Sequence, residues 1–133
     1  SRITNHAIVL ALTGDLGSGK TTFVQGMASG LGVQQRIISP TFIIVRNYKI
    51  KPITKHQSPI TNFYHVDLYR LENDIEKEVA NLGLDFLWGD KSNIVAIEWA
   101  EKIKKMLPKN TFWIKFENLG GEERKITVNR LIS

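Results

Sequence analysis

The chain contains no cysteine among its 133 residues and no hydrophobic run as long as a membrane-spanning helix. The first absence excludes disulfides, thiolate metal sites and thiol nucleophiles. The second absence, together with a start that lacks a signal-peptide core, predicts a soluble protein, and the lack of cysteine fits the reducing cytoplasm. The length and a hydrophobic content of 42% suit a single globular domain over residues 1–133.

Basic residues are in modest excess. Eighteen lysines and arginines against thirteen acids give a formal net charge of +5, and part of the excess lies in residues 49–55 and 102–109. An RNA or acidic partner is one interpretation of this charge. A solvated basic surface is the other, and we favour it because neither cluster is interleaved with stacking aromatics.

The most informative segment is residues 14–21, Gly-Asp-Leu-Gly-Ser-Gly-Lys-Thr, which matches the phosphate-loop pattern G-x-x-x-x-G-K-[ST]. An apolar run at residues 8–12 predicts a strand before it, and helical spacing predicts a helix over residues 21–31 after it. This context argues against an ordinary glycine-rich turn. Glycines let successive N–H groups point at a polyphosphate, and the helix N-terminus adds partial positive charge.

We therefore expect the loop to bind the phosphates of a nucleoside triphosphate. Lys20 would reach the β- and γ-phosphates as a point charge, and the Thr21 hydroxyl would bind Mg²⁺. The expected binding residues in and after the loop are Asp15, Leu16, Gly17, Ser18, Gly19, Lys20, Thr21 and Thr22.

The rest of the chain alternates predicted strands and helices. The predicted strands are residues 41–48, 63–69 and 94–97, followed by a hairpin of 111–117 and 124–131. The predicted helices are residues 72–82 and 101–107, and residues 49–62 form a long connection. This order predicts an α/β, P-loop NTPase-like three-layer fold with a mixed parallel/antiparallel sheet. Because the first strand begins so near Ser1, we also expect a truncated N-terminal element.

Two carboxylates stand where phosphoryl chemistry needs them. Glu98 ends an apolar strand, and Asp67 lies within an otherwise apolar and aromatic strand, where a lone carboxylate is costly unless it is paired or near metal. The alternatives are a surface acid for Glu98 and, for Asp67, an ion pair with Arg70 or another neighbour. His65 stays unassigned, since strand histidines commonly pack or bond a carbonyl.

Two further features bear on the nucleotide. Thr41 either contacts the γ-phosphate from a switch-like segment or simply begins a strand. The chain has no Asn-Lys-x-Asp motif after the loop, which favours adenine over guanine.

Four blocks of the sequence together resemble the bacterial TsaE (YjeE) family. The blocks are Gly-Asp-Leu-Gly-Ser-Gly-Lys-Thr-Thr-Phe at 14–23, Ser-Pro-Thr-Phe at 39–42, His-Val-Asp-Leu-Tyr-Arg at 65–70 and Ile-Glu-Trp-Ala at 97–100. The first block identifies only a phosphate loop, and the other three make the match specific. The connection at 49–62 looks longer and more basic than in the family, and residues 120–124 resemble a family turn that approaches the nucleotide.

The resemblance implies a partner-activated ATPase, weak alone, that is required for threonylcarbamoyladenosine in tRNAs reading codons that start with A. It would act with the TsaB and TsaD subunits, contact tRNA only through that complex, and hydrolyse ATP to ADP and phosphate to reset it. Lys20 would then bind phosphate, Thr21 and Glu98 would hold Mg²⁺, and Asp67 would support hydrolysis. Thr41 would belong to the switch segment.

The resemblance also places Trp99, the residue after Glu98, near the nucleotide. Two other functions stay open at this point. A small-molecule P-loop kinase would need an arginine lid, which the scattered arginines do not obviously form. A nucleotide-dependent binding module without significant catalysis would use ATP only to set its shape.

Overall fold

The computed structural model describes residues 6–15, 17–33, 45–50 and 60–130. Its strands and helices alternate along the chain as expected for an α/β protein. In chain order they are β1 (Ile8–Thr13), α1 (Lys20–Gly30), β2 (Val45–Lys49), β3 (Asn62–Asp67), α2 (Ile75–Asn81), the 3-10 helix η1 (Leu84–Gly89), β4 (Asn93–Glu98), the 3-10 helix η2 (Ala100–Met106), β5 (Phe112–Gly120) and β6 (Glu123–Arg130).

The strands form a six-stranded sheet in the order β2-β3-β4-β1-β5-β6. The four inner strands run parallel, and β2 and β6 pair antiparallel with their neighbours at the two ends. The mixed sheet predicted from the sequence is confirmed. Because parallel neighbours end at the same edge, the register that pairs Leu12 with Glu98 brings the end of β4 beside the loop that follows β1.

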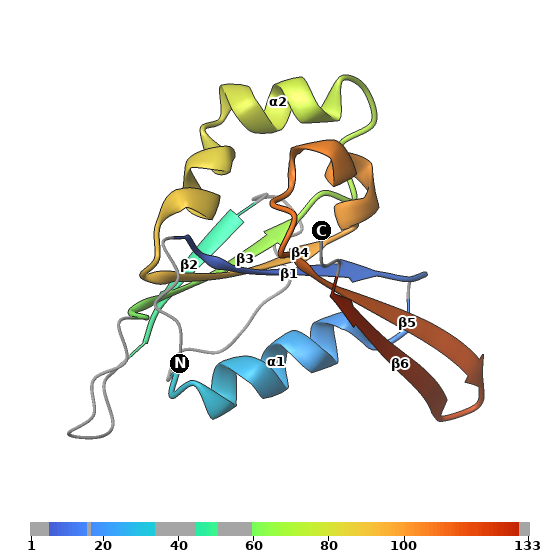
Figure 1. The fold of residues 1–133 in the computed structure, drawn as a ribbon. Helices are drawn as coiled ribbons and strands as arrows, with labels where there is room; N and C mark the ends of the chain where they lie inside the picture. Colours follow the sequence, from blue (N-terminus) through green and yellow to red (C-terminus); the bar gives the residue numbers. More distant parts are fainter. Residues whose placement is uncertain (1–5, 16, 34–44, 51–59, 131–133) are drawn as a thin grey trace.

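Helices cover both faces of the sheet, which gives three layers (Figure 1). The helix α1 lies on one face, and α2 with the two 3-10 helices lies on the other. Successive residues of β1 alternate between these faces. Val9 and Ala11 belong to the core under α2, whereas Leu10 and Leu12 belong to the core under α1.

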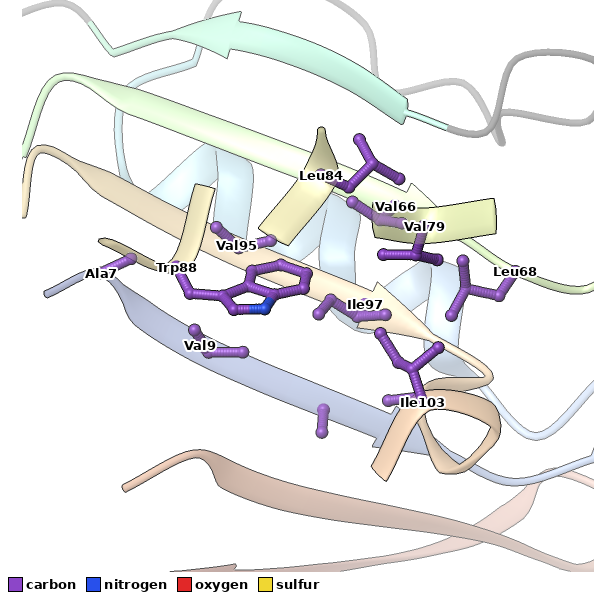
Figure 2. Packing of buried hydrophobic residues seen from close by; sticks show 12 residues of the cluster. Ala7, Val9, Val66, Leu68, Val79, Leu84, Trp88, Val95, Ile97 and Ile103 are labelled. Atoms are coloured by element: carbon purple, nitrogen blue, oxygen red, sulfur yellow. The ribbon is translucent and has the colours of Figure 1, made fainter. Parts of the chain in front are cut away.

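The core on the α2 side is built around the end of η1. Trp88 from η1 lies across the paired strands β1 and β4, near Val9 and Val95 (Figure 2). Every residue of β4 is buried, which explains the apolar run at residues 94–97 between Asn93 and Glu98. A central strand of this kind holds its last residue in a fixed place.

Several predicted elements differ in extent or type from those observed. The helix α2 begins at Ile75 because Asp74 before it has a positive φ of 49°. The second helix predicted at 101–107 is the 3-10 helix η2, interrupted at Ile103, whose φ of −127° is not helical. The strand predicted at 63–69 ends at Asp67. Predictions for residues 41–44 and 51–59 lie outside the described residues.

Within the part of the chain that the structure describes, no helix combines the length and the apolar character that a membrane crossing requires.

Candidate nucleotide-binding site

The loop between β1 and α1 depends on glycine at three positions. Gly14, Gly17 and Gly19 have φ values of +137°, +77° and +105°, which residues with a side chain rarely adopt. The Asp15 carbonyl accepts a hydrogen bond of 3.2 Å from the Ser18 N–H, so the loop curls back on itself. The expected binding residue Leu16 lies outside the described residues.

The N-terminus of α1 is left without a side-chain cap. Gly19 occupies the capping position and makes no side-chain hydrogen bond, and no acidic residue lies in the first turn. The free N–H groups and the positive end of the helix dipole therefore remain available to an anion.

Lys20 is buried beside this helix terminus, with 4% of its surface exposed. Its Nζ donates a hydrogen bond of 2.5 Å to the Gly14 carbonyl and lies 3.9 Å from the centre of the Trp99 ring. Burial lowers the pKa of Lys20, and four surrounding carboxylates oppose that shift. In decreasing order of effect they belong to Glu98, Glu101, Asp67 and Asp15.

Two carboxylates approach the loop from the ends of adjacent strands. Glu98 is 4% exposed, and its Oε2 lies 3.5 Å from the Thr21 hydroxyl, a long contact for a hydrogen bond. Asp67 ends β3 directly opposite Glu98 in the strand register. Burial raises the pKa of Asp67, and the charge of Glu98 adds to the rise, while a 3.0 Å hydrogen bond from the Tyr69 N–H opposes it.

His65 is a member of this site that sequence reasoning left unassigned. It is completely buried, and its Nε2 lies 2.5 Å from Glu98 Oε2. The signal in the sequence was its place two residues before Asp67, on the same face of the strand. Pairing His65 with Glu98 from that signal also required knowing that β3 lies beside β4, and the sequence pattern did not show this.

Trp99 turns the chain sharply after Glu98. It has a φ of 61°, an uncommon value for a residue with a side chain, and its N–H donates to the Leu12 carbonyl over 3.1 Å. Its ring lies over Lys20 and 5.3 Å from the ring of Tyr69. The tryptophan predicted to lie near the nucleotide is thus in contact with the lysine of the loop.

A cavity of about 850 Å³ opens at the loop. Residues 17–23 and Glu98 line it, and the β5–β6 hairpin supplies the opposite wall through Phe116, Gly121, Glu122, Arg124 and Ile126. Arg124 Nε donates to the Gly17 carbonyl over 3.2 Å, which ties the hairpin to the loop. The hairpin turn singled out in the sequence, residues 120–124, thus reaches this cavity.

The structure brings most of the predicted site residues together, but not all of them in one cavity. Thr22 lines the cavity with its neighbours in the loop. Asp67 and Trp99 do not line it but contact the groups described above, and Asp15 is exposed. Thr41 lies outside the described residues, so its predicted role in a switch segment is not addressed.

Comparison with known proteins gives a consistent result along the chain. Residues 1–126 match the family model described as "Threonylcarbamoyl adenosine biosynthesis protein TsaE". A curated relative of that name from Bacillus subtilis (strain 168) is 39% identical over 119 residues, which cover 90% of this chain and 67% of the relative. One from Treponema pallidum (strain Nichols) is 34% identical, and the match covers 96% of this chain and 85% of the relative.

The curated relatives named here are all longer than this chain. One from Nostoc sp. is 44% identical, and the match covers 71% of this chain but only 54% of that protein. The fold is similar to a solved structure, "Crystal structure of Bacillus subtilus YdiB", with a TM-score of 0.70 and 30% identity, covering 96% of this chain and 71% of that one. The chain therefore belongs to the TsaE family, whose members are named for threonylcarbamoyl adenosine biosynthesis.

Proposed function

We propose that this chain is a Mg²⁺-dependent ATPase subunit that acts with TsaB and TsaD in the threonylcarbamoyladenosine modification of tRNA. The observation that carries the proposal is the meeting of three groups at one cavity. Lys20 and Thr21 begin α1, and the Glu98 carboxylate lies 3.5 Å from the Thr21 hydroxyl. A lysine, a hydroxyl and a strand-end carboxylate in this arrangement are the parts that phosphate-loop ATPases use.

The chemistry of these donors fits magnesium. Mg²⁺ takes oxygen ligands and is commonly held by one or two carboxylates together with substrate phosphates and waters. Thr21 and Glu98 would hold the ion, and the described residues contain no group of three His, Cys, Asp or Glu side chains that would hold a metal by themselves. When bound with ATP, the ion neutralises charge on the β- and γ-phosphates.

The remaining groups bind and orient the nucleotide. The uncapped N-terminus of α1 and the loop N–H groups would bind the phosphates, and Lys20 would place its charge beside them. The positive φ of Trp99 sets its ring against Lys20, which restricts where that side chain reaches. We assign Asp67 the support of hydrolysis, by accepting a hydrogen bond from the attacking water.

The test is ATP hydrolysis with Mg²⁺, measured with and without TsaB and TsaD. We expect weak hydrolysis by the chain alone and a clear increase with both partners, which Glu98→Ala abolishes. Glu78→Ala is the matched control, because this exposed carboxylate lies on α2, on the opposite face of the sheet. It should behave as the unchanged protein.

Three other results would contradict the proposal. ATP binding without hydrolysis in the presence of both partners would favour a nucleotide-dependent binding module. Transfer of labelled phosphate from ATP to a metabolite would favour a small-molecule kinase. Rapid hydrolysis that does not respond to the partners would refute the partner-activated mechanism.

A further inference from the structure

The buried imidazole of His65 is tied to the carboxylate that the proposed function assigns to magnesium. His65 comes from β3 and is 0% exposed, and its Nε2 lies 2.5 Å from Glu98 Oε2 at the end of β4. Glu98 itself is 4% exposed. Among the described residues, its other side-chain partner is the Thr21 hydroxyl at the longer distance of 3.5 Å.

The surroundings of the imidazole indicate which group donates the hydrogen bond between His65 and Glu98. The second ring nitrogen, Nδ1, is buried and has no hydrogen-bond partner in the described part of the chain. A proton on Nδ1 would be an unsatisfied buried donor, which costs about 1–3 kcal/mol. The arrangement therefore favours a ring that carries its proton on Nε2 and donates a hydrogen bond from it to Glu98.

The hydrogen bond from His65 restricts the Glu98 side chain, whose carboxylate could otherwise rotate. The terminal torsion of a glutamate has broad minima, so burial alone does not orient its two oxygens. The bond from His65 engages the same oxygen, Oε2, that faces Thr21. Groups that donate to a metal-binding carboxylate in this way orient it and tune its affinity for the metal.

We propose that His65 is a positioning residue that orients Glu98 for Mg²⁺, so that His65 sets the affinity of the site for the metal without contacting the nucleotide. This inference rests on the proposed function, because it takes Glu98 as the magnesium-binding carboxylate. It adds the group that holds that carboxylate in place. A buried polar pair that only contributes to folding is the competing explanation.

The experiment measures binding of a fluorescent ADP analogue, mant-ADP, over a series of Mg²⁺ concentrations and in EDTA. His65→Leu removes the donor, whereas His65→Gln keeps an N–H at about the distance of Nε2. We expect His65→Leu to raise the Mg²⁺ concentration at half-maximal effect by about 10- to 100-fold. Its affinity for mant-ADP in EDTA should not change, and His65→Gln should restore most of the response to Mg²⁺.

Glu98→Ala separates this inference from the proposed function. Glu98→Ala should itself shift the Mg²⁺ response, and adding His65→Leu to it should have no further effect, since no carboxylate remains to be oriented. If Glu98→Ala shifts the response and His65→Leu does not, His65 is only structural and the inference fails alone. If Glu98→Ala leaves the response unchanged, the assignment of Glu98 fails, and the inference fails with it.

A further pair of variants covers the case in which His65→Leu does not fold. The amide of His65→Gln reaches the position of Nε2, whereas the shorter amide of His65→Asn reaches only that of Nδ1. The inference requires a response to Mg²⁺ near that of the unchanged protein in His65→Gln and a weakened one in His65→Asn. Equal responses in these two variants would overturn it.

Discussion

Replacing Gly14, the first glycine of the loop, tests why glycine is needed at that position. The neighbouring strand β5 leaves no room there for a side chain. A Cβ on Gly14 would lie 2.5 Å from the Phe116 carbonyl oxygen of β5, and 3.0 Å and 3.1 Å from Ser18 Oγ and Phe116 Cβ. Gly14 also has a φ of +137°. Both the backbone conformation and the neighbouring strand thus exclude a side chain.

The magnitude follows from these two contributions. A residue with a side chain at this φ costs about 1–3 kcal/mol, and overpacking against a neighbour costs about 1–3 kcal/mol more. The backbone oxygen of Phe116 is held in the sheet and cannot move aside as a flexible side chain would. We therefore expect Gly14→Ala to lower the free energy of unfolding by about 2–6 kcal/mol and Tm by about 8–24 °C.

Two other glycines supply matched controls. A Cβ on Gly17, which has a φ of +77°, would meet nothing within 4 Å, so Gly17→Ala should lose only about 1–2 kcal/mol from backbone strain. Gly26 is exposed in the middle of α1 and also has free space, so Gly26→Ala should gain about 0.5–1 kcal/mol. Urea and thermal unfolding followed by circular dichroism measure all three. A Gly14→Ala protein as stable as Gly17→Ala would refute the reasoning.

Three other changes have clear expected outcomes. Burial raises the pKa of Asp67, so the native state binds a proton more tightly than the unfolded chain. The stability gained from that tighter proton binding is lost as pH rises through the raised pKa. Asp67→Asn should therefore be more stable than the unchanged protein at pH 7 in urea unfolding, and an equal or lower stability would contradict this. Lys102→Met removes hydrogen bonds of 3.1, 3.0 and 2.9 Å to carbonyls in residues 68–71, so unfolding in urea should show a loss of about 1–3 kcal/mol. Phe86 is 81% exposed, so Phe86→Ser should change stability by less than about 0.5 kcal/mol, and a larger loss would indicate packing that this exposure does not show.

The central fold was predictable because its signals are local. The apolar runs at residues 8–12 and 94–97 predicted the two buried central strands, β1 and β4, and glycine with alternation predicted the β5–β6 hairpin. The region after Glu98 was not predictable in the same way. Its 3-10 geometry follows Trp99 with positive φ, and Lys102 reaches across to the carbonyls of another segment. Such contacts between distant segments leave no periodic pattern in the sequence.

In the candidate site, too, the features with local sequence signals were predictable and the contacts between distant segments were not. The loop is a continuous motif, so its place between β1 and α1, with Lys20 at the start of the helix, could be predicted from spacing alone. Glu98 could be placed because it ends an apolar strand. Pairing His65 with Glu98 required the order of the strands, and the bond from Arg124 to Gly17 joins residues 107 positions apart. The sequence therefore predicts the groups that line the cavity better than the groups that hold them in position.

The charges in the site depend on one another, and this affects how any Glu98 variant is interpreted. Among the four carboxylates that oppose the effect of burial on Lys20, Glu98 has the largest influence. Removing it would lower the pKa of Lys20 further, because burial would then be less opposed. If Glu98 holds Mg²⁺ as proposed, Glu98→Ala would weaken the site in two ways, through lost metal binding and through a less readily protonated lysine. The two effects separate with pH, because acidification increases the protonated fraction of Lys20 but does not replace a missing magnesium ligand. Nucleotide affinity in EDTA that recovers at lower pH, while the response to Mg²⁺ stays lost, would assign each part of the defect to its cause.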